Sequence, residues 1–263
     1  MTQVLTPRQL AEIEAWLERY SGTAASLEEG TAAAVLLAYQ EIDDWDDPAS
    51  TVPAALAAAA AAQEGQRASA EAAAQFAAIT TAIIRGSRSA ERLLRSVTGY
   101  ARNANPVDVY SRPIFDYRNA IAGGASAMMA QQRAFERAGQ LAETDAALGR
   151  RAGAILQFRR DRVQMYRRVI RPELSKTGTC GLCIAAASQL YTVKDLLPIH
   201  TRCKCEVIAV GSDADAAEHF NREDLEQIYV SRPDRSTARQ NLAKTRYRVI
   251  DVPELGPTLT PAA

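Results

Sequence analysis

Apolar residues recur at intervals of three and four over much of the first 170 positions, which predicts a mainly helical chain. Thr6 and Pro7 match a helix N-cap followed by a proline at the first helical position. Leu10, Ile13 and Leu17 follow at helical spacing. We therefore expect an amphipathic helix to begin the ordered part of the chain.

Further helices are expected with few interruptions between them. The first should end where Ser21 and Gly22 break the pattern, and a second is expected from about residue 26 to residue 40. Residues 52–84 are rich in alanine, the best helix former, and predict a long helical strut with Gly65 as a candidate break. Additional helices are expected at residues 90–100, 113–123, 125–139 and 145–171.

The pattern changes towards the C-terminus. Residues 206–210 indicate a short strand, and residues 246–252 alternate like a second strand that could pair with it. Helices are expected within residues 213–230 and 233–244, and residues 253–263 form a proline-rich tail without periodicity. The fold class is therefore expected to be mainly α, with a long helical N-terminal region followed by a small α+β module.

The distribution of charged residues along the chain is more informative than their total number. The 31 basic and 31 acidic residues balance, but residues 1–84 carry 3 basic and 12 acidic residues, whereas residues 85–176 carry 18 and 8. Segments of opposite charge indicate that the two parts meet each other or meet different partners. We predict an acidic helical arm at 1–50, an alanine- and arginine-rich helical domain at 51–172, the module at 173–252, and the tail at 253–263.

All four cysteines lie within 26 positions, in a stretch that also holds one of the two histidines. Two thiols separated by two residues, followed after about twenty residues by a second thiol pair, have the spacing of a structural zinc site. Five side chains compete for four positions around the metal. The favoured set is all-cysteine, with the histidine as an alternate ligand or a donor to a ligand, and the candidates are Cys180, Cys183, Cys203, Cys205 and His200.

Other chemistry could explain the same cysteines. Two disulfides between the pairs would suit an oxidising compartment, although the N-terminus has no secretory signal. Unliganded buried thiols are a further alternative. A redox role for Cys180 and Cys183 lacks the expected strand–helix context, and a catalytic zinc would need an open position with an acid such as Glu206 nearby.

Two charged stretches are candidate contact regions. Arginines on the expected helix at 145–171 could bind DNA phosphates or a partner protein, namely Arg151, Arg159, Arg160, Arg167 and Arg168. The alternatives are a solvated face or pairing with the acidic N-terminal segment. The acidic turn at 41–48 lacks the glycine and the terminal glutamate of a calcium loop, and Trp45 within it is a candidate docking anchor.

The cysteine-rich stretch resembles the Mu F-like minor head proteins of tailed bacteriophages, especially those of phages that infect actinobacteria. The residues that carry the resemblance are the run 171–183, then Tyr191, Leu197-Pro198, and the run 200–205. Thr201 stands where the family usually has proline and Lys204 where it usually has arginine. The resemblance is specific over about residues 171–210, looser over the preceding helices, and absent from the first fifty residues.

The resemblance implies a structural virion protein inside the capsid near the portal, made in the host cytoplasm and supporting head assembly and DNA packaging or delivery. Its expected cofactor is zinc. Its expected partners are the portal protein, major capsid or scaffold proteins, and packaged double-stranded DNA, with no membrane. We expect no enzymatic activity, because His200 and His219 are the only histidines and His200 is better used at the metal. The alternatives are a DNA-binding protein or a head-associated nuclease or protease.

Overall fold

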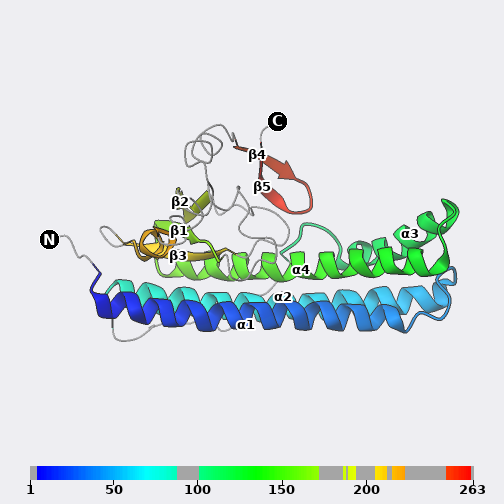
Figure 1. Ribbon diagram of the computed structural model, residues 1–263, viewed down its shortest axis with the longest axis horizontal. Helices are drawn as coiled ribbons and strands as arrows, with labels where there is room; N and C mark the ends of the chain where they lie inside the picture. The colour runs from blue at the N-terminus through cyan, green and yellow to red at the C-terminus, as the bar shows by residue number, and fades with distance from the viewer. Residues whose placement is uncertain are drawn as a thin grey trace, which may run out of the picture.

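The computed structural model describes residues 5–87, 101–171, 186–187, 189–193, 205–211, 215–222 and 247–261. This part of the chain is mainly helical, as expected. Three helices of more than thirty residues lie side by side and a shorter one joins them at one end (Figure 1). The helices are α1 (Pro7–Gln40), α2 (Pro48–Ile84), α3 (Pro106–Ala122) and α4 (Ala127–Arg160).

Each of these helices begins after a residue whose side chain caps it. The Thr6 hydroxyl accepts a hydrogen bond from the Gln9 backbone, and the Gln9 side chain accepts one from the Thr6 backbone, which completes a capping box. The side chains of Asp47 before α2 and Asn105 before α3 each accept one backbone hydrogen bond as N-caps, and each residue is followed by proline at the first position. Ser126 caps α4. Each cap satisfies backbone N–H groups that the helix itself leaves unpaired.

Three glycines let the long helices approach closely. A Cβ at Gly65 of α2 would lie 2.0 Å from the Thr31 hydroxyl of α1. On α4, a Cβ at Gly149 would lie 2.2 Å from the Gln66 carbonyl oxygen, and one at Gly153 would lie 1.9 Å from the Ala70 carbonyl oxygen. Gly149 and Gly153 are one helical turn apart, so they form a flat strip along which the α2 backbone lies.

Two small sheets complete the described structure. β1 (Met165–Val169) is the central strand of an antiparallel sheet, between β2 (Leu190–Thr192) and β3 (Glu206–Val210), and its Tyr166 lies opposite Ala209. β4 (Tyr247–Val252) and β5 (Gly256–Pro261) form a separate antiparallel hairpin. Figure 1 shows the three-stranded sheet over one end of the helices and α3 at the other end.

The interior consists of two apolar clusters, one at each end of the helices. The cluster beneath the sheet contains Ile13, Phe76 and Phe158 together with Tyr166 and Ile208 from the strands. The other cluster lies near the turn between α1 and α2. Its members from α1, that turn and the facing helices include Val35, Tyr39, Trp45, Val109, Ile114 and Leu141. Within the described residues, no helix is both long and apolar enough to cross a membrane.

Several expected helix boundaries are wrong. The chain does not break at Ser21 and Gly22, because α1 runs through both, and Gly65 lies inside a continuous α2. A glycine in a helix costs only about 1 kcal/mol relative to alanine. Packing along three adjacent helices outweighs this cost. The expected helix at 113–123 begins earlier, at Pro106. The expected helices at 90–100 and 233–244 lie outside the described residues.

The arginine-rich helix expected at 145–171 is confirmed only as far as Arg160. The helices expected at 125–139 and 145–171 are joined in one helix, α4, which ends at Arg160, and the chain then turns into β1. Arg162 sits in this turn with a φ of 53°, a left-handed conformation that ends the helix. Tyr166 and Arg168 are then both buried on one side of the strand, so the pattern has a period of two.

The C-terminal strands also differ from expectation. The strand at 206–210 is confirmed as β3, but its partner is β1 and not the segment 246–252. That segment is β4, and it pairs with β5, which lies in the expected tail. Both sheets therefore join residues across the expected boundaries at 172 and 252. The helix expected within 213–230 is described at residues 216–222.

The expected acidic arm belongs to the core. α1 contributes buried side chains to both apolar clusters, including Ile13 and Leu17 in one and Val35 and Tyr39 in the other. Trp45, the candidate docking anchor, is buried against Tyr117 with ring centroids 4.6 Å apart. The N-terminal residues therefore pack against their own chain over the length of α1.

Candidate functional site

Cys205 is the described member of the five candidate zinc ligands. It directly precedes β3 and is half-buried at the junction of the sheet with the helices. The other candidates, Cys180, Cys183, Cys203 and His200, lie outside the described residues. Among the described residues, no three His, Cys, Asp or Glu side chains gather as a metal site requires. The structure therefore describes the surroundings of one candidate ligand, Cys205.

A buried arginine contacts the Cys205 sulfur. Arg168 of β1 is 2% exposed, and its Nη1 donates a hydrogen bond to Cys205 Sγ at a distance of 3.5 Å. The same guanidinium lies over the Tyr191 ring, 5.3 Å from the ring centroid. A cation beside a thiol favours the thiolate, which is the form that binds metal. This neighbourhood therefore fits a thiolate at Cys205.

The backbone around Arg168 is fixed by a side chain that the sequence pattern did not single out. Asn221, in the helical segment 216–222, donates from Nδ2 to the Arg168 carbonyl at 2.7 Å. Its Oδ1 accepts a hydrogen bond from the Ile170 N–H at 3.0 Å. Asn221 is 2% exposed. The available sequence signal was an asparagine within an expected helix. In the structure this asparagine is buried, and a buried amide needs hydrogen-bond partners.

A buried polar row continues from β3 into the helices. Glu206 is nearly inaccessible, and burial raises its pKa to about 7 although nearby Arg150 lowers it. Tyr20 hydrogen-bonds to the Glu206 side chain, and burial together with Glu206 raises the tyrosine pKa. Arg150 Nη1 donates to Glu28 Oε2 at 3.0 Å. The row borders a small, partly open cavity of about 20 Å³, which has room for about one water molecule.

The ion pair between Glu28 and Arg150 shows that the acidic and basic segments of the chain contact each other. Glu28 belongs to the acidic N-terminal segment and Arg150 to the basic segment, and both side chains are buried. The two segments therefore meet inside the molecule at this point. Removing one member of a buried pair leaves an uncompensated charge and costs about 3–5 kcal/mol.

The five candidate DNA-contacting arginines do not form one surface. Arg167 Nε contacts Asp215 Oδ2 at 2.7 Å, and Arg168 is buried against Cys205. Arg159 and Arg160 are exposed at the end of α4, and Arg151 is half-buried. The structure therefore separates two of these arginines, which stabilise the strand region, from the remaining three on the helix.

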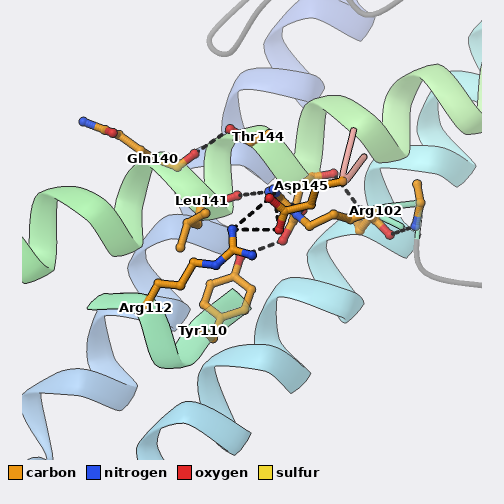
Figure 2. A network of polar contacts seen from close by, with 10 residues as sticks. Arg102, Tyr110, Arg112, Gln140, Leu141, Thr144 and Asp145 are labelled. Atoms are coloured by element: carbon orange, nitrogen blue, oxygen red, sulfur yellow. Dashed lines mark hydrogen bonds and ion pairs between the residues drawn. The ribbon is translucent and has the colours of Figure 1, made fainter. Parts of the chain in front are cut away.

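A second buried polar cluster lies between α3 and α4 (Figure 2). Arg102 Nε and Nη2 each lie 2.8 Å from Asp145 Oδ1, and the Tyr110 hydroxyl donates to Asp145 Oδ2 at 2.8 Å. Gln66 of α2 donates to the Asp145 carbonyl at 3.3 Å. The Gln66 side chain also accepts from the Ala101 N–H at 2.7 Å. Sequence patterning gave no indication of this cluster, which joins three helices and the segment before α3.

Comparison of the chain with protein-family models, curated proteins and solved structures gives no match.

Proposed function

We propose that this chain is a minor head protein of a tailed phage, a structural component that lies inside the capsid near the portal. The observation that carries the proposal is the cysteine- and histidine-containing motif at residues 171–205, which resembles the Mu F-like family. The chain would support head assembly and DNA packaging or delivery. Its partners would be the portal protein and the major capsid or scaffold proteins.

The extended helical body supports a role as a rigid spacer. α2 has 37 residues, so at about 1.5 Å per residue it is about 55 Å long. Glycine contacts at Gly65, Gly149 and Gly153 hold the helices at close range, and the pair between Glu28 and Arg150 joins α1 to α4. A body fixed at several points along its length can hold two partners at a defined separation.

We propose further that a structural zinc ion is bound by Cys180, Cys183, Cys203 and Cys205, with His200 as the alternate ligand. The contact from Arg168 to the Cys205 sulfur supports this assignment, because N–H donors to a metal-bound thiolate orient the ligand. A structural zinc supplies folding free energy, with apparent binding energies of about 10–16 kcal/mol in small modules.

Elemental analysis of the reduced full chain tests the zinc assignment. We expect about one zinc per chain. Cys203→Ser should release the metal, whereas His200→Ala should retain it with weaker affinity. The reverse ranking would place the histidine among the four ligands, and a chain purified under reducing conditions without any metal would exclude the site.

Co-purification with the portal protein tests the structural role. The full chain is co-expressed with the portal protein of the same phage, and the lysate is treated with nuclease before affinity purification. We expect the two proteins to elute together without DNA. An association that nuclease abolishes, together with salt-sensitive binding to duplex DNA, would favour the DNA-binding alternative. Nuclease or protease activity of the metal-loaded chain, lost on Cys203→Ser, would favour an enzyme.

A further inference from the structure

The polar cluster in Figure 2 borders a cleft that is separate from the cysteine region. The cleft has a volume of about 360 Å³, within the range of small-ligand pockets. Arginine side chains from three segments line it: Arg102 before α3, Arg112 on α3, and Arg137 on α4. Gln140 and Thr144 add polar groups to the α4 side of the lining. The lining is therefore basic and rich in hydrogen-bond donors.

A carboxylate from the C-terminal hairpin lines this cleft. Glu254 lies in the turn between β4 and β5, and its Oε2 accepts a hydrogen bond from Arg112 Nη1 at 2.8 Å. Glu254 Oε1 lies 3.6 Å from Arg102 Nη1. Burial raises the pKa of Glu254, but Arg112, Arg102 and Arg137 together hold it below the ordinary value. The three guanidiniums thus already stabilise an anion at this position.

The three arginines pair with three carboxylates, which are held in different ways. Asp145 is fixed at the centre of the structure by Arg102 and Tyr110. Asp116 lies on α3, 3.8 Å from Arg137. Glu254 belongs to a two-stranded hairpin whose described contacts with the body include Asn103 donating to the Glu254 and Pro253 carbonyls. Of the three carboxylates, Glu254 is the one that lines the cleft and belongs to no helix.

The donor count also favours a larger anion than a carboxylate. Each guanidinium carries five N–H donors, whereas a carboxylate offers two acceptor oxygens. A phosphate group offers more oxygens and more charge, and it pairs with arginine in a two-point geometry. The side chains of Arg112 and Arg137 are 37% and 42% exposed, so both can reach a ligand that enters from solvent.

We propose that this cleft binds a small phosphate-bearing ligand, and that Glu254 is its internal substitute in the unliganded chain. The ligand would displace the Glu254 carboxylate and contact Arg112 and Arg137, while Arg102 stays anchored to Asp145. Binding would thereby release the β4–β5 hairpin from the segment that precedes α3. The site is independent of the proposed zinc and of the proposed place in the virion.

Calorimetric titration of the full chain with inorganic pyrophosphate tests the site. Glu254→Gln removes the competing charge and should bind pyrophosphate at least about tenfold more tightly than the wild type. Adding Arg112→Gln to that variant should weaken binding by about tenfold or more, because a hydrogen bond to a charged group is lost. Arg133→Gln is the matched control, since Arg133 lies one turn from Arg137 on an exposed part of α4 and should leave binding unchanged.

Hydrogen exchange of the wild-type chain provides a measurement that needs no variant. Pyrophosphate should speed exchange at residues 247–261 and at the Asn103 amide, which donates to the Glu254 carbonyl. The proposal is overturned if Glu254→Gln fails to bind pyrophosphate, if its affinity equals that of the wild type, or if Arg112→Gln has no effect.

A parallel titration with a short DNA duplex distinguishes a free phosphate compound from backbone phosphates. Glu254→Gln and Arg112→Gln should change pyrophosphate affinity more than duplex affinity. If they change duplex affinity alone, the cleft is a nucleic-acid contact and the small-ligand proposal is wrong. Circular dichroism and urea unfolding of each variant confirm that the compared chains are folded.

Discussion

Asp145 shows how a single buried charge is accommodated in this protein. Its side chain is 0% exposed, and it accepts from Arg102 and from the Tyr110 hydroxyl. The Tyr110 carbonyl in turn accepts from the Tyr39 hydroxyl of α1. An ionised carboxylate is costly in an apolar interior unless it is paired and hydrogen-bonded. Asp145 therefore fixes the relative positions of α3, α4 and the segment that holds Arg102.

Tyr110→Phe tests this arrangement with the smallest available change. The substitution leaves Asp145 Oδ2 without its tyrosine donor and should lower the free energy of unfolding by about 1–3 kcal/mol. Tyr117→Phe, on the same helix, is the control, because the Tyr117 hydroxyl makes no hydrogen bond within the part of the chain that the structure describes. That change should stay within about 0.5 kcal/mol. Urea unfolding measures both, and equal effects would contradict the role of Asp145.

Glu254 makes stability depend on pH in a defined direction. Its pKa in the folded chain lies below the ordinary glutamate value because Arg112, Arg102 and Arg137 outweigh the effect of burial. Its stabilising contribution is therefore present above the ordinary glutamate pKa and is lost as the pH falls through the folded pKa. Urea unfolding at a series of pH values should show the wild type exceeding Glu254→Gln at neutral pH, with the difference shrinking in acid. A difference that grows in acid would show that the arginines do not stabilise this carboxylate.

At the scale of elements, the contact between α2 and α4 depends on residues without side chains. Gly149 and Gly153 face Gln66 and Ala70 across the helix interface, at distances that exclude a Cβ. Overpacking a tight interface costs about 1–3 kcal/mol and occasionally more. Replacing either glycine must therefore push the two backbones apart.

Gly153→Ala and Gly139→Ala give a matched pair on α4. Gly153→Ala should destabilise the chain by about 2–4 kcal/mol, because the new Cβ would lie 1.9 Å from the Ala70 carbonyl oxygen. At Gly139, no described atom lies within 4 Å of a Cβ, so alanine should stabilise the helix by about 0.5–1 kcal/mol. Thermal unfolding measures the two effects, and stabilisation by both substitutions would mean that the helices lie further apart.

Local signals predicted the start of α1 but not the continuity of the long helices. The Thr6–Pro7 cap is readable because its hydrogen bonds involve neighbouring residues. The breaks expected at Gly22 and Gly65 were wrong because packing against other helices outweighs the intrinsic cost of glycine. The segment after Arg160 fits a helical and a strand pattern equally well, and its pairing with β2 and β3 decides for a strand. Such pairings join residues that are far apart in sequence, so periodicity alone does not reveal them.

At the scale of the whole molecule, α1 is part of the body and not an appendage. It supplies Ile13 and Leu17 to the cluster beneath the sheet, and Val35 and Tyr39 to the cluster at the other end. The acidic turn that follows was expected to separate an arm from the body, yet Trp45 within it is buried. Apolar side chains at helical spacing look the same in an arm and in a core, so the sequence did not distinguish the two.

Removing residues 1–50 should therefore prevent folding. The truncated chain would expose the faces of α2 and α4 that α1 covers, and it would leave Arg150 buried without Glu28. Circular dichroism with thermal unfolding should show no cooperative transition, whereas the full chain should show one. A truncated chain that unfolds cooperatively and retains its helices would restore the interpretation of residues 1–50 as an independent arm.

The candidate metal site stays a prediction, and the structure adds the surroundings of one of its residues, Cys205. The cysteine spacing indicates a metal site because ligand spacing is local, and Cys205 lies directly before the strand that was expected there. Its contact with Arg168 was not predictable, because the arginine was assigned to a helix and to DNA. The basic cleft left no sequence signal, since Arg102, Arg112, Arg137 and Glu254 converge only through the fold.

Imaging of phage particles tests the proposed function most directly. Under the proposed function, particles of the encoding phage would be compared with and without an electron-dense tag on the full-length protein. The account predicts a tagged density inside the capsid at the single vertex that holds the portal, with the chain detectable in purified particles by mass spectrometry. A chain absent from purified particles, or a tag distributed over all vertices or confined to the tail, would contradict it.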